Sequence, residues 1–310
     1  MNIANIIFLS PINQELEVLL ENYHINKKIR FLTEENLNGE DLEWADALVT
    51  FKTTSNYDYS KVKWVHSLGA GVDNFTFHNE WKDDVILTRT ITSFGQRISE
   101  YCLSYILKDI QFHEQFQYQK SIKLWKPITP KMLNEVCVLI YGTGEIGQKI
   151  AEVLTGFGVK VYGVSRSGKQ KDHFADILTI DSHYSLLSQV DYVINTLPLT
   201  EKTENLFHAG IFDHYSSIGF INVGRGESVK EKDLLQAITR NQVRFAVIDV
   251  FANEPLPEDH VFWEHPKIFL TPHISAVTTA KEAAECFVET LENIEKNKPL
   301  PNRVDVKQGY

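Results

Sequence analysis

One stretch of the chain, residues 136–167, constrains the fold more than any other. It opens with the apolar run Val136–Tyr141, which has the length and composition of a fully buried strand. A glycine turn over residues 142–147 follows at once, and a helical pattern then leads to a second apolar run at residues 160–164. This order predicts a strand–helix–strand unit of a parallel sheet.

The glycines of the turn, Gly142, Gly144 and Gly147, indicate a binding role. Glycine permits a tight turn and a close approach of the backbone to a pyrophosphate, and the helix that follows offers free N–H groups at the positive end of its dipole. A structural strand-to-helix turn is the alternative reading. The strand before the turn, and the helix and strand after it, favour a dinucleotide site.

Bulk properties narrow the possibilities further. A chain of 310 residues is long enough for two domains, and its net charge of -10 argues against a nucleic-acid or anionic-membrane partner. The cysteines at 102, 137 and 286 form no C-x-x-C pair, so we expect neither a zinc ribbon nor a disulfide framework, which fits a reducing cytoplasm. No apolar run reaches membrane-spanning length, so we expect neither secretion nor membrane insertion.

The first ninety residues alternate short strands with short helices, which is typical of a small parallel α/β domain. Strands are predicted at residues 3–10, 29–32, 45–51, 64–68 and 85–88. The fourth strand leads into Gly69-Ala70-Gly71, where successive backbone N–H groups can point at an anion. A plain strand-to-helix loop is an equally good reading of that sequence. The segment 51–59 is expected to influence which substrate side chain is accepted.

The pattern changes after Thr92. Phe94-Gly95 is interpreted as a hinge, and residues 97–118 are predicted to form one long helix. This helix carries more apolar surface than one core-facing stripe needs, which suggests burial between domains or between subunits.

The last third of the chain contains four more strands and two more helices. The strands are predicted at residues 191–197, 218–223, 245–250 and 267–271, and the helices at 208–215 and 280–297. The last three strands lead to Arg225, Glu254 and His273. Parallel sheets bind ligands beyond the carboxyl ends of their strands, so these side chains can converge beside the glycine turn. Each alone has an ordinary structural explanation, but together they favour catalysis.

At this point the motifs resemble those of the D-isomer-specific 2-hydroxyacid dehydrogenases, most closely the glyoxylate/hydroxypyruvate reductase branch. The resemblance rests on residues 67–73, 94–101, 142–147, 222–226, 249–251, 254–257 and 271–276. It implies a doubly wound Rossmann coenzyme domain, residues 98–276, inserted into a smaller flavodoxin-like α/β substrate domain, residues 1–97 and 277–310. It also implies a homodimer.

The resemblance further implies roles for individual residues. Arg225 would clamp the 2-oxo acid, His273 would donate a proton to the ketone oxygen, and Glu254 would accept a hydrogen bond from His273. The implied substrate contacts are Leu68, Gly69, Ala70, Gly71, Arg225 and His273. The implied coenzyme contacts are Gly142, Gly144, Glu145, Ile146, Gly147, Ser165, Arg166, Ser167, Leu197, Pro198, Thr203, Val223, Gly224 and Asp249. No metal site is expected.

The end of the second nucleotide strand departs from the usual pattern for NAD. Proteins of this fold that use NAD carry an acidic residue there, which binds the ribose hydroxyls. This chain has Ser165-Arg166-Ser167 instead, so no carboxylate is present to repel a 2′-phosphate. We therefore expect NADPH to be preferred, with NAD(H) still accepted, although an ordinary polar turn is the alternative reading.

The leading hypothesis is thus an NADPH-dependent cytoplasmic reductase of small 2-oxo acids, such as glyoxylate or hydroxypyruvate, that yields D-2-hydroxy acids. Two alternatives stay open. One is the same chemistry on a bulkier 2-oxo acid. The other is a non-catalytic NAD(P)-sensing binding protein, against which the set of Arg225, Glu254 and His273 argues.

Overall fold

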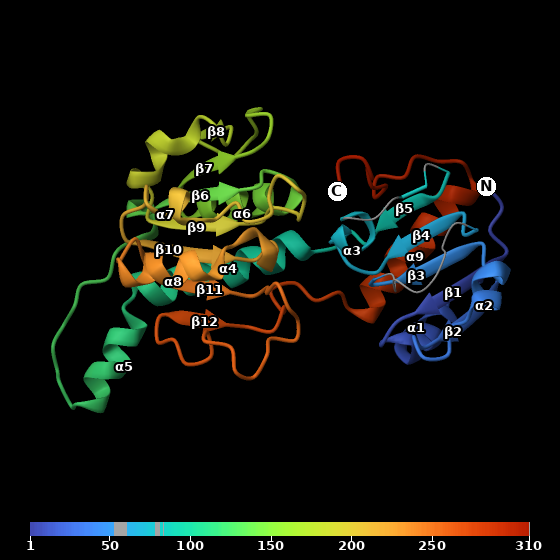
Figure 1. Ribbon diagram of the computed structural model, residues 1–310, viewed down its shortest axis with the longest axis horizontal. Helices are drawn as coiled ribbons and strands as arrows, with labels where there is room; N and C mark the ends of the chain where they lie inside the picture. The colour runs from blue at the N-terminus through green and yellow to red at the C-terminus, as the bar shows by residue number, and fades with distance from the viewer. Residues whose placement is uncertain (53–60, 78–80, 83, 310) are drawn as a thin grey trace. The chain divides into compact units, whose positions relative to one another are not determined.

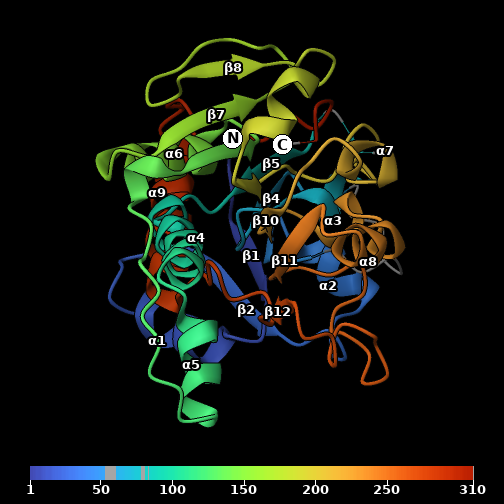
Figure 2. The same cartoon turned by 90° about the vertical axis from the view of Figure 1, so that its left-hand side faces the viewer.

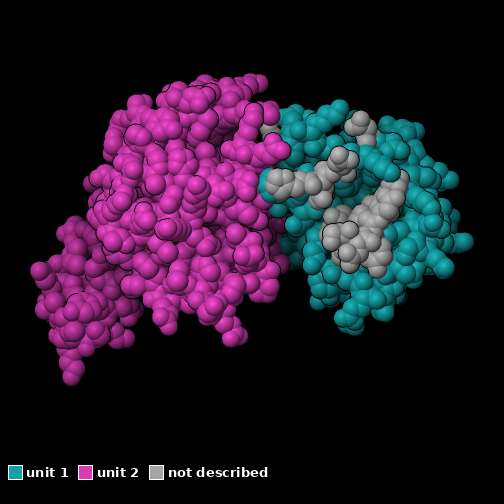
Figure 3. Space-filling model, viewed as in Figure 1, with its two compact units in different colours: residues 1–92, 278–310 teal, residues 93–277 magenta. Residues whose placement is uncertain are grey.

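The computed structural model of the chain describes residues 1–52, 61–77, 81–82 and 84–309. The chain forms two compact units (Figure 3), which comprise residues 1–92 with 278–310, and residues 93–277. Of the segment expected to influence side-chain specificity, residues 53–59 lie outside the described residues.

The boundaries of the units differ by a few residues from the predicted domain ends at 97 and 276. The reason is the helix that follows the first boundary, α4 (Phe94–Ile110), which begins before residue 97. At Gly95 this helix comes so near to α6 (Glu145–Gly156) that an added Cβ would lie 2.8 Å from Cβ of Lys149. The first turn of α4 therefore belongs to the second unit.

The first unit contains a five-stranded parallel sheet in the order β2-β1-β3-β4-β5 (Figure 1). Its strands are β1 (Asn5–Leu9), β2 (Lys28–Leu32), β3 (Ala47–Thr50), β4 (Trp64–Ser67) and β5 (Ile86–Arg89). This strand order is that of flavodoxin-like folds. The residues of β3 and β4 are all buried, as expected for a parallel sheet covered on both faces.

Helices cover both faces of this sheet. On one face α1 (Asn13–Leu20) and α9 (Ala280–Glu295) pack through a core that includes Leu16 and Phe287. On the other face lie α2 (Gly39–Trp44) and α3 (Asp73–Thr76). The helix α9 returns the chain to the first unit and begins with a capping box, in which Thr279 and Glu282 satisfy each other's backbone N–H groups.

The second unit contains a seven-stranded parallel sheet in the order β12-β11-β10-β9-β6-β7-β8. Its strands are β6 (Cys137–Tyr141), β7 (Lys160–Val164), β8 (Asp176–Leu178), β9 (Tyr192–Asn195), β10 (Ile218–Asn222), β11 (Val243–Ile248) and β12 (Ile268–Leu270). The order is the Rossmann order with one further strand at an edge, so the predicted α/β fold class is confirmed. All its strands are parallel, and the direction in which successive strands are added to the sheet reverses between β6 and β9, beside the glycine turn.

Two layers of helix enclose the second sheet (Figure 2). The helices α4 and α6 cover one face, and α7 (Ala209–Phe212) and α8 (Glu231–Thr239) cover the other. Short 3-10 segments occur at Leu133–Glu135, His183–Gln189 and Gly226–Ser228. The sequence analysis did not anticipate β8 or α8, because β8 is only three residues long and charged residues fill the first turn of α8.

The prediction of one helix over residues 97–118 is wrong. The helix α4 ends at Ile110, and Phe112 has a left-handed backbone with φ of 56°, which no continuous helix can include. A separate helix, α5 (His113–Ser121), then extends away from the sheet (Figures 1 and 2). The helix predicted at residues 208–215 is also shorter than expected and is limited to α7.

No helix in the described part of the chain combines the length and apolar character needed to cross a bilayer.

Candidate active site

The glycine turn after β6 allows its backbone to pack closely against α6 and leaves space beside Gly144 for a ligand. Gly142 has φ of 97°, in the left-handed region that favours glycine. A Cβ on Gly147 would lie 1.8 Å from the carbonyl oxygen of Gly142, so α6 packs directly against the turn. At Gly144 an added Cβ would have no heavy atom within 4 Å among the described residues. The turn and the first N–H groups of α6 therefore fit a dinucleotide pyrophosphate.

The polar segment after β7 presents hydroxyl groups. The Oγ of Ser165 accepts a hydrogen bond from the N–H of Gly168 at 3.1 Å, and the Oγ of Ser167 accepts from Lys169 at 3.3 Å. Because each hydroxyl oxygen acts as the acceptor, its proton can be donated to an anion. Arg166 lies exposed between them. The segment is thus a set of donors with no carboxylate at the ribose position.

Lys171 is a further basic residue near the turn, and the sequence analysis did not single it out. Its Nζ donates a hydrogen bond to the carbonyl oxygen of Thr143, within the glycine turn itself. The segment between β7 and β8 thereby brings an ammonium group to the turn. The only feature of the sequence that could have indicated Lys171 is the pair of lysines at residues 169 and 171.

Buried polar side chains hold the loop that carries Arg225. Asn195 ends β9, and its Nδ2 donates to Oδ1 of Asn222 at 2.9 Å and to Oγ of Ser228 at 2.8 Å. Asn222 and Ser228 both donate to the carbonyl oxygen of Arg225, at 3.1 and 2.6 Å. Buried polar groups must be paired, so this network fixes the backbone on both sides of Arg225. The sequence analysis missed Asn195 and Ser228.

Two glycines allow the same loop to pack tightly. A Cβ on Gly226 would lie 2.0 Å from the backbone carbon of Phe251, and one on Gly224 would lie 2.8 Å from the carbonyl oxygen of Leu197. The ends of β9, β10 and β11 are therefore in backbone contact at one edge of the sheet. Val223 and Gly224 lie in this buried segment, as expected for residues beside a coenzyme.

The loop after β9 contains the other predicted nicotinamide-side residues. The N–H of Leu197 donates to Oδ1 of Asn195 at 3.1 Å. The hydroxyl of Thr203 donates to the carbonyl oxygen of Pro198 at 2.6 Å, and Thr203 also accepts from the N–H of Thr200. Thr203 therefore shapes the loop around Pro198 through its own side chain.

Asp249, at the end of β11, holds the segment that carries His273. Its side chain is fully buried, and one carboxylate oxygen accepts from the hydroxyl of Thr271 at 2.5 Å and from the N–H of Ile274 at 2.9 Å. The other accepts from the N–H of Ser275 at 2.9 Å. The backbone N–H of His273 donates to the carbonyl oxygen of Asp249 at 2.8 Å. Because a carboxylate can accept about four hydrogen bonds, a coenzyme contact by Asp249 stays a prediction.

These bonds place His273 in an unusual backbone conformation, with φ of 53°. A non-glycine residue in this region is uncommon and is held by its surroundings. The Nδ1 of His273 lies 2.8 Å from Oε2 of Glu254. The side chains of His273 and Glu254 are 47% and 36% exposed, so the pair is open to solvent and to a ligand.

Glu254 is itself oriented by the backbone, since its Oε1 accepts from the N–H of Phe251 at 2.9 Å. Burial acts to raise the pKa of the Glu254 carboxyl, but hydrogen bonds from His273 and Phe251, with the positive charges of His273 and Arg225, lower it overall. The structure thus pairs His273 with Glu254, and the charge of Arg225 acts on the same carboxyl, whereas their catalytic roles stay a prediction.

The first unit has its own loop at the end of β4, which contains predicted substrate contacts. Leu68 is buried and its N–H donates to the carbonyl oxygen of Thr50 at 3.0 Å. Gly69, Ala70 and Gly71 are half-buried. A contact of this loop with a substrate carboxylate stays a prediction.

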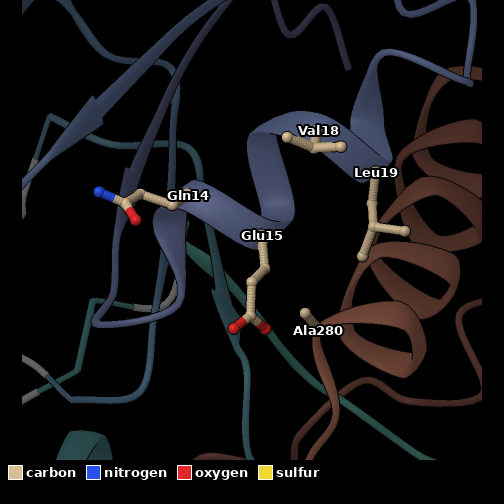
Figure 4. Close-up of a pocket in the computed structure, with 5 residues that line it drawn as sticks. All are labelled: Gln14, Glu15, Val18, Leu19 and Ala280. Atoms are coloured by element: carbon tan, nitrogen blue, oxygen red, sulfur yellow. The ribbon is translucent and has the colours of Figure 1, made fainter.

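A shallow groove elsewhere on the first unit is unrelated to these residues. It has a volume of about 420 Å³ and is lined by Gln14, Glu15, Val18, Leu19 and Ala280 (Figure 4). None of the predicted site residues lines it. The described residues also contain no group of three or more His, Cys, Asp or Glu side chains that could hold a metal ion.

Comparison with known proteins identifies the family. The sequence model of the D-isomer specific 2-hydroxyacid dehydrogenase, NAD binding domain, matches residues 103–275. The chain belongs to the D-isomer-specific 2-hydroxyacid dehydrogenase family. Its members are NAD(P)-dependent oxidoreductases, so this chain is an enzyme of that type.

Individual relatives agree with this assignment. Glyoxylate/hydroxypyruvate reductase A of Serratia proteamaculans is 34% identical over 257 residues, which cover 81% of this chain and 82% of that protein. A family member from Xanthobacter autotrophicus, in complex with NADPH and MES, has a TM-score of 0.90 at 27% identity and covers all of both chains. The NADPH-dependent glyoxylate/hydroxypyruvate reductase of Sinorhizobium meliloti, with NADP and sulfate, has a TM-score of 0.88 at 27% identity and covers 99% of this chain and 100% of its own.

Proposed function

We propose that this protein uses NADPH to reduce small 2-oxo acids of the glyoxylate and hydroxypyruvate type to D-2-hydroxy acids. The observation that carries the proposal is the His273–Glu254 pair, 2.8 Å apart, at the sheet edge that also carries Arg225. Relatives with 27% and 34% identity are named as glyoxylate/hydroxypyruvate reductases, which supports the substrate class.

The roles of the residues follow from their chemistry. When bound, the coenzyme supplies a hydride to the carbonyl carbon of the substrate. Protonated His273 donates its Nδ1–H to Glu254 and keeps Nε2–H for the carbonyl oxygen, where it delivers the proton that completes the hydroxyl group. Glu254 holds the ring in place and balances its positive charge.

Arg225 positions the substrate. Its guanidinium donates to the carbonyl oxygen of Gly224 at 2.7 Å, which orients the planar group. A guanidinium carries five N–H donors in a fixed fork, and two of them match the adjacent carboxylate and carbonyl oxygens of a 2-oxo acid. Backbone N–H groups of the loop at residues 69–71, in the first unit, are also suited to a carboxylate.

NADPH preference follows from the segment after β7. The hydroxyl groups of Ser165 and Ser167 donate to the 2′-phosphate, and Arg166 supplies a fixed positive charge. Lys171 adds an ammonium group beside the glycine turn. The structures of relatives that contain NADPH or NADP support this preference.

We also propose that the enzyme is a cytoplasmic homodimer. Its three cysteines are free thiols, in keeping with a reducing compartment. After α4 the chain exposes large apolar side chains, of which Trp125 is 99% exposed; the others are Phe116, Tyr118, Ile122 and Leu124. Large apolar side chains exposed within one short segment favour an interface, and a second copy of the chain would cover them.

The test is a panel of 2-oxo acids assayed with NADPH and with NADH by the loss of reduced-coenzyme absorbance. Glyoxylate, hydroxypyruvate, pyruvate and a branched-chain 2-oxo acid cover the size range. We expect the highest kcat/KM with one of the first two acids and NADPH. Faster turnover of the branched acid would support the bulkier-substrate alternative. Coenzyme binding without turnover of any acid would contradict the proposed enzyme and favour a sensor.

A further inference from the structure

We propose that Ser67 and Arg89 are positioning residues for the substrate carboxylate, and that they aim two backbone N–H groups, those of Ala70 and Gly71, at it. The inference rests on the proposed function, because it concerns how the same substrate is held. Of the three N–H groups in the loop at residues 69–71, only two would then bind the carboxylate, and Ser67 and Arg89 would orient them.

The first N–H group of the loop is already occupied. The Oγ of Ser67, a fully buried residue at the end of β4, accepts a hydrogen bond from the N–H of Gly69 at 3.3 Å. The N–H groups of Ala70 and Gly71 have no hydrogen-bond acceptor within the described ranges of the chain. Because both residues are only half-buried, these two N–H groups are the donors of the loop that stay available to an anion.

Each of these two N–H groups belongs to a peptide plane whose carbonyl is held from the other side. The hydroxyl of Ser67 donates to the carbonyl oxygens of Gly69 and Gly71, at 3.1 and 3.3 Å, and the shorter bond holds the peptide plane that contains the N–H of Ala70. Arg89 donates from its guanidinium to the carbonyl oxygen of Ala70 at 3.3 Å, which fixes the plane that contains the N–H of Gly71.

The planar peptide bond determines the direction in which the N–H groups of Ala70 and Gly71 point. In a trans peptide the C=O and N–H groups point in opposite directions. A donor that binds each carbonyl therefore makes the N–H of the same plane point away from Ser67 or Arg89. A hydrogen bond to the carbonyl also polarises the peptide group and strengthens its N–H as a donor, most of all when the carbonyl's partner is charged, as Arg89 is.

The backbone of each positioning residue is itself anchored. The carbonyl oxygen of Ser67 accepts from the N–H and the hydroxyl of Thr90, at 2.9 and 3.0 Å. The backbone of Arg89 exchanges hydrogen bonds with Asn302, whose O and Nδ2 both lie 3.0 Å from their partners on Arg89. The loop is thus braced by β4, β5 and the C-terminal segment of its own unit.

The experiment compares Ser67→Ala and Arg89→Met with wild type. We expect KM for glyoxylate to rise about 3- to 10-fold in Ser67→Ala and about 10-fold or more in Arg89→Met, with kcat within about threefold of wild type. The Kd of NADPH should stay unchanged. Calorimetric titration of oxamate, an unreactive 2-oxo acid analogue, into the enzyme–NADPH complex should show the same losses without turnover.

Matched controls separate positioning from general effects. Ser10→Ala removes another strand-end serine, which likewise accepts from the N–H two residues later, here Ile12 at 3.2 Å. Arg303→Met removes an exposed positive charge from the same unit. Both controls should keep the wild-type KM and oxamate Kd. A thermal melt checks folding, and if Ser67→Ala does not fold, Arg89→Met alone decides the proposal.

The outcomes distinguish this inference from the proposed function. If wild type turns over glyoxylate while Ser67→Ala and Arg89→Met keep its KM and oxamate Kd, the positioning role is wrong and the function stands. A rise in KM shared by the controls would also overturn the positioning role. If wild type neither turns over any 2-oxo acid nor binds oxamate, the proposed function itself fails.

Discussion

His273 and Glu254 form a hydrogen-bonded pair, with Nδ1 of the imidazole 2.8 Å from Oε2 of the carboxylate, although each residue is held by a different part of the backbone. The segment of His273 is tied to Asp249, whereas Glu254 is tied to the N–H of Phe251. The pair is therefore placed by the ends of two neighbouring strands, β11 and β12. The backbone contacts at these strand ends, and not only the hydrogen bond between the two side chains, therefore determine the geometry of the pair.

We expect His273→Ala to lower kcat by about 10²–10⁴-fold, the usual contribution of a general acid. The side chain is half exposed and belongs to none of the buried hydrophobic clusters among the described residues, so the variant should fold and bind NADPH with the wild-type Kd. Steady-state kinetics measure the loss of kcat, and fluorescence titration measures the Kd of NADPH. A near-normal kcat in a folded variant would rule out His273 as the proton donor.

Glu254→Gln should reduce kcat less than His273→Ala and should also change how stability depends on pH. The pKa of Glu254 in the folded protein is below its ordinary value of 4.5. Its carboxylate therefore stabilises the fold at pH values above 4.5, and this contribution disappears as the pH falls through the lowered folded pKa. Glutamine cannot take on the charge, so it lacks the contribution at every pH.

Thermal melts of wild type and Glu254→Gln over a pH series test this linkage. We expect a difference in Tm at neutral pH that narrows as the pH is lowered below 4.5. Glu258→Gln is a suitable control, because it removes a nearby exposed carboxylate that forms no ion pair with another described residue, and it should show little difference throughout. A Tm difference that stays constant into strong acid would contradict the lowered pKa.

The glycine turn allows packing and coenzyme binding to be tested separately. Gly147→Ala places a Cβ 1.8 Å from a backbone oxygen, so the turn or α6 must shift and the protein should lose stability. Gly144→Ala meets no neighbour within 4 Å among the described residues, so its Tm should stay near that of wild type. Its Cβ would occupy the open space that a pyrophosphate approaches, so its Kd for NADPH should rise. Equal changes of Tm in the two variants would contradict the assignment of Gly147 to packing and of Gly144 to coenzyme binding.

Much of the fold could be predicted because its strands are continuous apolar runs that end in glycine or polar residues. For the same reason Arg225, Glu254 and His273 could be placed at one sheet edge, since parallel strands end together. The break at Phe112 could not be predicted, because neither glycine nor proline marks it. The network of Asn195 and Ser228 was also hidden, because a buried asparagine or serine resembles a loop residue until its partners are known.

The exposed segment that follows α4 predicts the oligomeric state. Sedimentation equilibrium should give about twice the chain mass of 35.6 kDa. Trp125→Ser removes the most exposed large side chain of the segment and should weaken the dimer, whereas Trp263→Ser, at a 55% exposed tryptophan outside the segment, should not. A wild-type monomer at micromolar concentration would contradict the proposed dimer.

Coenzyme selection is the last prediction. A charge-assisted hydrogen bond is worth roughly 1.5–3 kcal/mol, or about 10- to 150-fold in binding, so Arg166→Ala should raise the Kd of NADPH by that factor. NADH lacks the 2′-phosphate, and its Kd should stay nearly constant. Ser165→Asp should go further and favour NADH, because a carboxylate binds the ribose hydroxyls and repels the phosphate.

The measurements are Kd by fluorescence titration and kcat/KM for both coenzymes. Arg240→Ala is the control. Arg240 is an exposed arginine directly after α8, outside the segment that follows β7, and its guanidinium lies 3.4 Å from the carboxylate of Asp213. If wild type prefers NADH, or if Arg166→Ala weakens both coenzymes equally, the segment Ser165–Ser167 does not recognise the 2′-phosphate. A loss of affinity in Arg166→Ala that is confined to NADPH and absent from Arg240→Ala, together with a preference for NADH in Ser165→Asp, would assign that recognition to the hydroxyl and guanidinium donors after β7.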